Sequence, residues 1–420
     1  MKKQNWKRVL SLGMCAGMIM TGVGSVNAAE EAADTGEKPF AGETVTVYTA
    51  HVENKGWQDI VSLVEEKTGI ILEGIAAPTN YSDVVTKLSS SLSAGDDTFD
   101  IVRVDELLGV TYSAAGYLEP ITDIMEPELQ YYPVGSMENI SKAADGEYYL
   151  LPMDMGPMYF FVNTDVMEAA GVEIPTTKEE FIEAAKAMTG DGVYGYGASW
   201  SKGGQLYNDV VRWVYSFDGD MYDWTDEGTK EALQFMHDML YEYEIVPIAA
   251  MGDIYDAMNQ KLIDGKYGMA FQWGFLAEVS ADAGKWGNGL EIAEMPTFTT
   301  NNTIGSGWLL AVNANSKKID AAKEVLKVWA SEEGAMCNLK FDGSCHTGVL
   351  ATEEAKETSP QGAALEAYMS AGVVQPRPMP VTANELLEVV ENYVGAYLTN
   401  EITLDECVEK ATKDIQALIE

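Results

Sequence analysis

Residues 44–48 read TVTVY, and residues 99–104 read FDIVRV. Both segments are short and rich in β-branched or aromatic residues, which predicts two strands. Between them, the apolar residues of 57–67 recur at helical spacing, residues 70–72 start another strand, and residues 81–94 again suit a helix. This βαβαβ alternation predicts an α/β fold in which helices cover both faces of a parallel sheet.

The same alternation resumes further along the chain. Strands are expected at 148–152, 158–163, 267–272, 291–295 and 307–313, and helices at 176–188, 205–217, 226–243, 252–263, 274–283 and 319–335. Thr177 is the expected N-cap of the 176–188 helix, and Glu180 completes a capping box three residues later. Residues 382–419 predict two more helices. Trp213 and Trp329 lie on apolar helical faces and are expected in the core.

The amino terminus has the pattern of a signal peptide. Four basic residues within positions 2–8 precede the apolar run Val9–Val23, and Val26 and Ala28 supply small residues at −3 and −1 of a cleavage site. We therefore expect cleavage after Ala28, with export to the periplasm or the cell surface. Lipidation at Cys15 is disfavoured, because Cys15 lies inside the apolar run. The acidic, aperiodic stretch 29–42 is expected to be a flexible tether.

The composition excludes several classes of protein. Removing residues 1–28, which hold four basic and no acidic residues, leaves 392 residues and changes the formal charge from −39 to −43. That length suits two domains, and that charge repels nucleic acid. The three histidines are scattered and no cysteine has zinc-ligand spacing, so neither a metal nor another cofactor is expected. Cys337 and Cys345 are close enough in sequence for a local disulfide.

Several short blocks occur in a definite order between residues 44 and 418. They are FDIVRVD (99–105), AGYLEP (115–120), GEYYLLP (146–152), NTD (163–165), AGV (170–172), PTT (175–177), GKYGMA (265–270), MPTF (295–298), GSGW (305–308) and TLDECV (403–408). Together they resemble the extracellular solute-binding proteins of ABC sugar importers, the maltose-binding protein-like group of solute-binding family 1.

The resemblance implies a two-lobed periplasmic-binding-protein-like fold with a ligand cleft between the lobes. Lobe 1 would comprise residues 43–150 and about 296–345, and lobe 2 about 151–295 and 346–420, with Pro152 near a crossover. It also implies a monomeric receptor, not an enzyme, that binds a carbohydrate and delivers it to the transmembrane permease subunits. The expected carbohydrate is an oligosaccharide. Closure of the lobes around the ligand would be the working motion.

Polar candidates for ligand contact follow from the strand order. In open α/β sheets, ligands bind beyond the carboxyl ends of strands. His51 and Glu53 follow the first strand, Asp105 follows the third, and Asp154 follows the next expected strand. Such side chains can bind sugar hydroxyl groups. Asp105 has a structural interpretation as well, since it can cap a helix beginning at Glu106.

Aromatic candidates could stack on the C–H faces of a sugar. Trp273 ends the 267–272 strand, Trp308 stands beside glycines, and Trp200 lies in a loop of Gly, Ser and Lys where an exposed ring would indicate function. Phe275 aligns loosely with an aromatic residue that the family uses for stacking. Burial in the core remains the alternative for Trp273, Trp308 and Phe275.

Other interpretations stay open at this point. The same fold could bind a polyamine or another cation, and an exported glycosidase would need two carboxylates about 5–10 Å apart. The acidic loop 218–226 lacks the glycine and glutamate of an EF-hand, so we expect it to cap the following helix rather than to bind calcium. Gly156 stands where the maltose-binding protein has a carboxylate, which argues against maltose.

Overall fold

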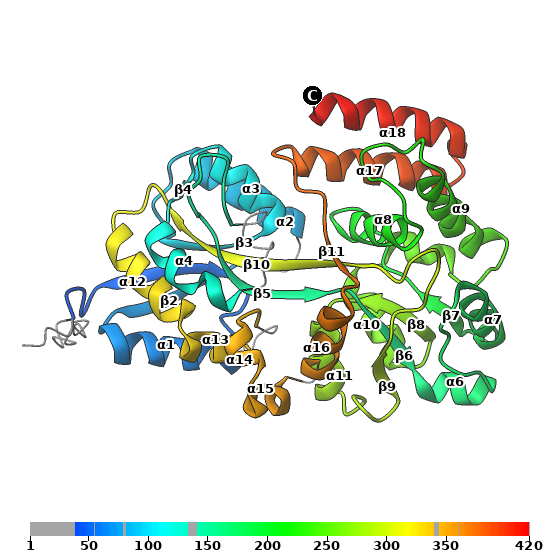
Figure 1. Cartoon of the computed structure of the whole chain (residues 1–420), viewed down its shortest axis with the longest axis horizontal. Coiled ribbons are helices and arrows are strands. Elements are labelled where there is room, and N and C mark those ends of the chain that lie inside the picture. The colour runs from blue at the N-terminus through cyan, green and yellow to red at the C-terminus, as the bar shows by residue number, and fades with distance from the viewer. Residues whose placement is uncertain are drawn as a thin grey trace, which may run out of the picture. The chain divides into compact units, whose positions relative to one another are not determined.

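The computed structural model describes residues 38–53, 55–78, 81–132, 141–339, 344–359 and 361–419 (Figure 1). The predicted signal peptide, Cys15 and most of the predicted tether lie outside the described residues. Within the described ranges, no helix combines the length and the apolar content needed to cross a bilayer.

The larger of two sheets contains the predicted βαβαβ unit. β1 (Thr44–Thr49) lies parallel to β2 (Ile71–Ala76) and β3 (Ile101–Asp105), and α1 (Lys55–Thr68) and α2 (Tyr81–Ser93) connect these strands (Figure 1). The alternation expected from the sequence is therefore confirmed. Gly69, with φ of 72°, ends α1 in the left-handed conformation that glycine adopts without strain.

A long antiparallel strand extends this sheet. β10 (Thr303–Asn313) pairs with β3, with β4 (Leu118–Glu119) and with β5 (Leu151–Pro157), and it lies parallel to β11 (Val374–Pro376). The order along the sheet is β11-β10-β3-β1-β2. Because β5 pairs with β10, Asp154 of β5 lies opposite Trp308 of β10.

The smaller sheet has four strands in the order β7-β8-β6-β9. They are β6 (Tyr159–Asn163), β7 (Tyr194–Gly197), β8 (Tyr267–Gln272) and β9 (Leu290–Ala293). The chain enters this sheet at Met158, directly after β5, and leaves it between Ala293 and Thr303. Its helices are α6 (Thr164–Ala170), α7 (Lys178–Met188), α8 (Gln205–Ser216), α9 (Glu227–Tyr241), α10 (Tyr255–Ile263) and α11 (Phe275–Asp282).

Shorter helices and the carboxy-terminal pair complete the described chain. They are α3 (Glu106–Ala114), α4 (Thr122–Glu128), η1 (Leu129–Tyr131), η2 (Ile248–Gly252), α12 (Ile319–Ala330), α13 (Glu332–Asn338), α14 (Thr347–Leu350), α15 (Glu353–Thr358), α16 (Gly362–Ala371), α17 (Ala383–Leu398) and α18 (Leu404–Ile419). The carboxy-terminal pair α17 and α18 lies over α8 and α9 in Figure 1, and its apolar residues join the core of the smaller sheet.

Each sheet has its own apolar core. Phe160, Trp213 and Leu386 belong to the core around the smaller sheet, whereas Val47 and Trp329 belong to a core around the larger sheet. Trp213 and Trp329 are 0% and 2% exposed, so the prediction that both are core residues is confirmed. Burial of such apolar surface is the main favourable contribution to folding.

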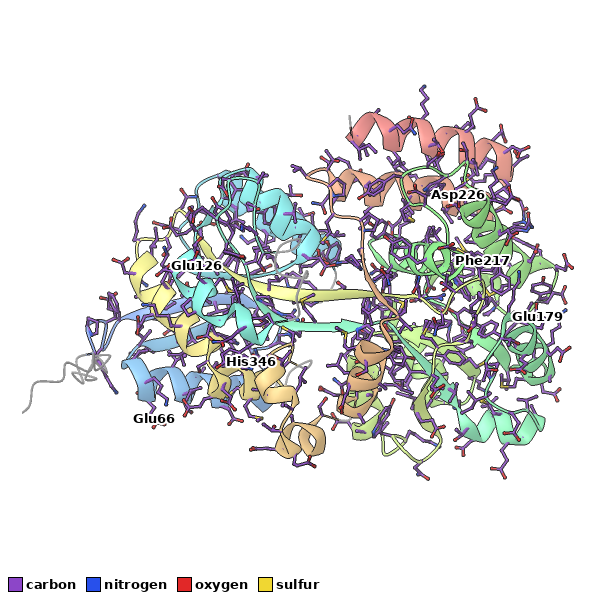
Figure 2. All side chains as sticks on the ribbon, in the orientation of Figure 1. Glu66, Glu126, Glu179, Phe217, Asp226 and His346 are labelled. Atoms are coloured by element: carbon purple, nitrogen blue, oxygen red, sulfur yellow. The ribbon has the colours of Figure 1, made fainter. Side chains whose placement is uncertain are left out.

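Acidic residues lie on the outside of these helices. Glu66, Glu126 and Glu179 are exposed side chains on α1, α4 and α7 (Figure 2). The high negative charge is therefore carried largely by solvated helix faces, where mutual repulsion is screened by salt. It says little about the charge of a ligand.

Two local predictions are decided by the structure. Asp226 accepts a hydrogen bond from the Thr229 backbone N–H at 3.1 Å and so caps α9, as expected for the acidic loop. No cluster of possible metal ligands occurs among the described residues. Cys337 and Cys345 do not form a disulfide. Burial raises the pKa of the Cys345 thiol, and a thiol that stays protonated is unreactive.

His346 caps α14 in its neutral form. Its Nδ1 accepts a hydrogen bond from the Val349 backbone N–H at 3.3 Å, and its ring stacks on Tyr131 with centroids 4.7 Å apart. Burial lowers the pKa of His346, although the negative charge of Glu332 acts in the opposite direction. Protonation would also place a proton on the nitrogen that accepts from Val349.

We expect the folded protein to lose stability at mildly acidic pH partly through His346. The unfolded chain binds a proton on histidine near pH 6.5, and the folded chain does so only at lower pH, so the free energy of unfolding falls as pH falls below about 6.5. His346→Asn keeps a capping acceptor without this titration. Thermal melts between about pH 8 and pH 5 should show a smaller loss of Tm in the variant, and equal losses would contradict the assignment.

Candidate functional site

A cavity of about 360 Å³ lies among elements of both sheets. This volume is within the range of small-molecule sites, which is about 300–1,000 Å³. Side chains from β5, β10 and the start of α2 meet side chains from α8, α10 and the segment after β8. The lining includes Tyr81, Asp105, Asp154, Tyr159, Gln205, Asn208, Tyr255, Asp256, Trp273, Phe275, Ser306, Trp308, Gln361 and Arg377.

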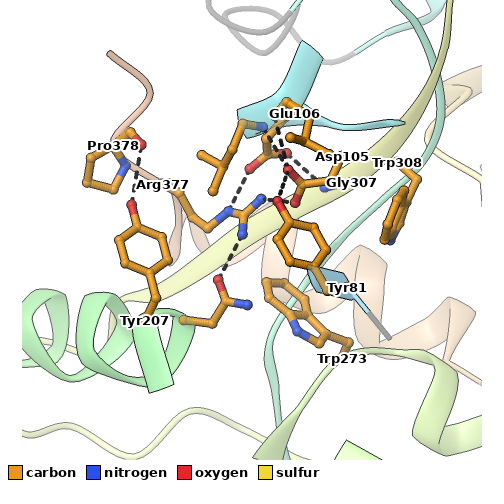
Figure 3. Close-up of polar contacts among 12 residues, drawn as sticks. Tyr81, Asp105, Glu106, Tyr207, Trp273, Gly307, Trp308, Arg377 and Pro378 are labelled. Carbon is orange, nitrogen blue, oxygen red and sulfur yellow. Dashed lines mark hydrogen bonds and ion pairs between the residues drawn. The ribbon is translucent and has the colours of Figure 1, made fainter. Parts of the chain in front are cut away.

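A buried arginine lies beside the cavity. Arg377 follows β11 and is 4% exposed. Its Nη2 donates to Asp105 Oδ2 at 2.7 Å, its Nε to Glu106 Oε1 at 2.8 Å, and its Nη1 to Asn208 Oδ1 at 2.8 Å (Figure 3). Burial raises the pKa of the Glu106 carboxyl, against the charge of Arg377. Burial acts to lower the pKa of Arg377, but the two carboxylates raise it overall. The guanidinium group therefore stays charged.

Asp105 has the structural role that the sequence suggested and lines the cavity as well. Its Oδ1 accepts from the Leu107 backbone N–H at 2.9 Å, which caps α3, and from the Tyr81 hydroxyl at 3.1 Å. Glu106 Oε2 accepts from the Gly307 backbone N–H at 2.8 Å. A Cβ on Gly307 would lie 2.1 Å from the Asp154 carbonyl oxygen, so only glycine permits this close approach of β10 to β5.

The side chain of Trp308 forms one wall of the cavity, and charged residues hold it in place. Its backbone N–H donates to Asp154 Oδ1 at 2.7 Å, and Asp154 Oδ2 accepts from Arg103 Nη2 at 3.1 Å. The Arg103 guanidinium lies 4.2 Å from the centroid of the Trp308 ring, within the distance of a cation–π contact. The indole is therefore fixed in orientation while part of its surface stays exposed.

Trp273 forms another wall, from the other sheet. Its Nε1 donates to the Tyr255 hydroxyl at 3.1 Å, and its backbone N–H donates to Gln272 Oε1 at 2.8 Å. Phe275 lies near Tyr255, with ring centroids 6.2 Å apart in an edge-to-face arrangement. Trp273 and Phe275 are both partly exposed, which excludes full burial in the core for either ring.

The structure brings five of the eight candidate residues together. Asp105, Asp154, Trp273, Phe275 and Trp308 all line the cavity. Contact of these five with a ligand stays a prediction.

The other three candidates lie elsewhere among the described residues. Glu53 is exposed and His51 is buried in the turn after β1, and neither lines this cavity. The expectation that Trp200 is exposed is wrong. Trp200 is 0% exposed, because it is packed in the core of the smaller sheet, where its Nε1 donates to Asp209 Oδ2 of α8 at 2.7 Å. Asp209 in turn pairs with Arg212 at 3.4 Å.

The sequence reasoning missed Arg377, Asn208, Tyr81 and Tyr255. Arg377 stands between Pro376 and Pro378, directly after a strand of three residues. The rule that selects residues beyond strand ends would have found it if β11 had been predicted. Tyr255 begins a helix that was predicted, so its position at a helix terminus was the available signal.

Comparisons with known proteins agree with this architecture. A family model described as bacterial extracellular solute-binding protein matches residues 48–336, more than half of the chain. The solved structure of maltose-bound MalE3 from T. maritima superposes with a TM-score of 0.80 at 20% identity, covering 89% of this chain and 99% of that one. At this identity the likeness shows the two-lobed fold alone.

Two curated relatives are named for different classes of ligand. An arabinooligosaccharide-binding protein of Halalkalibacterium halodurans is 22% identical over 242 residues, which are 52% of this chain and 50% of that protein. This chain thus matches about half the length of that relative. A probable amino-acid ABC transporter periplasmic-binding protein of Sinorhizobium fredii is 22% identical over 377 residues, which are 84% of this chain and 83% of that protein.

Proposed function

The chain belongs to the bacterial extracellular solute-binding proteins, which bind ligands and are not enzymes, and on that premise we propose that it receives a carbohydrate for an ABC importer. The ligand would be an oligosaccharide bound in the cavity beside Arg377. The complex would then deliver it to the transmembrane permease subunits. One curated relative is named an arabinooligosaccharide-binding protein, and the MalE3 structure contains maltose, so both names are consistent with a carbohydrate ligand.

The observation that carries the proposal is the pair of tryptophan walls. Trp273 and Trp308 come from different sheets, and both are partly exposed and line the same cavity. Protein groups already bind the indole N–H of Trp273 and the backbone N–H of Trp308. Apolar ring faces are then available to stack on the C–H faces of a sugar. Phe275 and Tyr255 add further aromatic surface, which favours more than one sugar ring.

We propose that the two lobes follow the two sheets and close around the ligand. The sheets have separate cores, and the cavity is lined from both. Hinge closure around a ligand is common in binding proteins of this architecture. A monomer would suffice for this motion, since both walls come from one chain.

The paired carboxylates argue against hydrolysis. Asp105 is bound to Arg377 at 2.7 Å and Asp154 to Arg103 at 3.1 Å. A glycosidase needs one carboxyl as a proton donor and one as a base or nucleophile, whereas Asp105 and Asp154 each have an oxygen bound by an arginine. Amino acids and polyamines remain the competing ligands, the first because of the name of one relative.

A thermal-shift panel tests the proposal. The protein would be melted with maltotriose, arabinotriose, mannitol, spermidine and single amino acids. One sugar should raise Tm selectively, because a ligand at 100 times its Kd stabilises the folded state by about 2.7 kcal/mol. Loss of that shift in the Trp273→Ala variant would tie it to the cavity. A shift with spermidine or an amino acid alone would overturn the carbohydrate proposal.

A further inference from the structure

The hydroxyl group of Tyr255 accepts two hydrogen bonds inside the cavity. Asn208 Nδ2 donates to it at 3.1 Å, and Trp273 Nε1 donates to it at 3.1 Å. An indole N–H can only donate, so that contact has a fixed direction. The two bonds occupy the oxygen lone pairs. No acceptor for the hydroxyl's own proton lies within hydrogen-bond distance among the residues that the structure describes.

Arg377 sets the direction of the other bond. Its Nη1 donates to Asn208 Oδ1 at 2.8 Å, and a guanidinium group has no acceptor. The carboxamide must therefore present its oxygen to Arg377 and its NH₂ group to Tyr255. Arg377 cannot turn away, because Asp105 and Glu106 hold its Nη2 and Nε at 2.7 and 2.8 Å. Hydrogen bonds thus run in one direction, from Arg377 through Asn208 to Tyr255.

The hydroxyl keeps its proton at physiological pH. Burial raises the pKa of Tyr255 to about 12, although its contacts with Asn208 and Trp273 act to lower it. Tyr255 lines the cavity together with both of its donors. The hydroxyl proton, for which the described residues supply no acceptor, is therefore available to whatever occupies the cavity.

We propose that Tyr255 is a specificity-determining donor, which selects ligands that place an oxygen acceptor against its hydroxyl and disfavours ligands that place an ammonium group there. A sugar hydroxyl, ring oxygen or glycosidic oxygen can accept this bond. An ammonium group offers only donors and would leave the Tyr255 proton unpaired or force the chain of bonds to break. This inference rests on the proposed function, and it separates carbohydrate from polyamine by the geometry of the site.

Neutron diffraction of the deuterated, unliganded protein tests the direction of the bonds without any ligand. We expect deuterons on Asn208 Nδ2 and Trp273 Nε1 that point at Tyr255 Oη, and the Tyr255 deuteron directed into the cavity. An Asn208 amide with its oxygen toward Tyr255, accepting from the hydroxyl, would overturn the inference whatever the protein binds.

Calorimetric titration tests the consequence for binding, with maltotriose, arabinotriose and spermidine as probes. Tyr255→Phe should lower the affinity for the sugar that the wild type binds by about tenfold, because one hydrogen bond is lost. Tyr241→Phe is the matched control, because its hydroxyl donates to the Leu398 carbonyl at 2.9 Å away from the cavity. A sugar affinity unchanged in Tyr255→Phe, but lost in Trp273→Ala, would overturn the donor role and leave the proposed function standing. Binding of spermidine with no sugar bound would overturn both.

Discussion

Replacing Trp273 with alanine is expected to weaken binding of the carbohydrate ligand by about 100-fold or more. The ring is partly exposed to the cavity, and its edge is fixed by the bond from Nε1 to Tyr255 at 3.1 Å. A preordered aromatic residue at the centre of a binding site contributes about 2–4 kcal/mol on truncation, and 2.7 kcal/mol is a factor of 100. Isothermal titration of both proteins measures the difference.

The control for this experiment is another partly buried tryptophan. Trp286 contacts Phe161, with ring centroids 6.3 Å apart, and does not line the cavity. Trp286→Ala should retain the wild-type affinity even if its Tm falls. An affinity for Trp273→Ala equal to that of the wild type would contradict the placement of the ligand between the two tryptophan walls.

The salt dependence of binding distinguishes a sugar from a cationic ligand, which the Trp273→Ala variant alone does not. A ring can stack on a sugar or contact a cation, so loss of binding in Trp273→Ala is compatible with either. A cation attracted by the acidic protein would bind more weakly as salt screens that charge, whereas a neutral sugar would not. The family places the chain among solute-binding proteins, and the chemistry of the solute is decided by such measurements.

The fold was largely predictable because local patterns decide most of its elements. The helix expected at 81–94 is α2 (Tyr81–Ser93), and the strand expected at 267–272 is β8. β5 was predicted at 148–152 but spans Leu151–Pro157. Its second half contains Gly156 and a proline, which disfavour a strand, and it is extended by pairing with β10, more than 140 residues away.

The site was only partly predictable, because burial depends on partners that are distant in space. Trp200 stands in a loop composition typical of exposed residues, yet Asp209 on α8 binds its indole and the helix covers it. Arg377 was missed because β11 has three residues and no strand pattern of its own. Its partners Asp105, Glu106 and Asn208 become neighbours only when the sheets are assembled.

Replacing Arg377 with methionine is expected to destabilise the folded protein by about 3–5 kcal/mol. The substitution leaves Asp105 and Glu106, which are 6% and 1% exposed, as buried charges without their counter-ion. Removing one partner of a buried ion pair costs about this amount, because the remaining charge stays desolvated and unpaired. Urea unfolding followed by tryptophan fluorescence measures the loss. Lys67→Met, which breaks an exposed pair with Glu333, should cost much less stability than Arg377→Met, because solvent screens that pair.

A neutral triple variant shows whether the uncompensated charge is the cause. In Asp105→Asn, Glu106→Gln, Arg377→Met, the side-chain oxygens can still cap α3 and accept from the Gly307 N–H, but none of these three positions carries a charge. Because buried ion pairs replaced as a unit are often nearly neutral in stability, this variant should recover most of the loss. It should still bind sugar more weakly than the wild type, since Asn208 is no longer oriented by Arg377. A triple variant as unstable as Arg377→Met would show instead that the shape of the arginine side chain, rather than its charge, holds the site together.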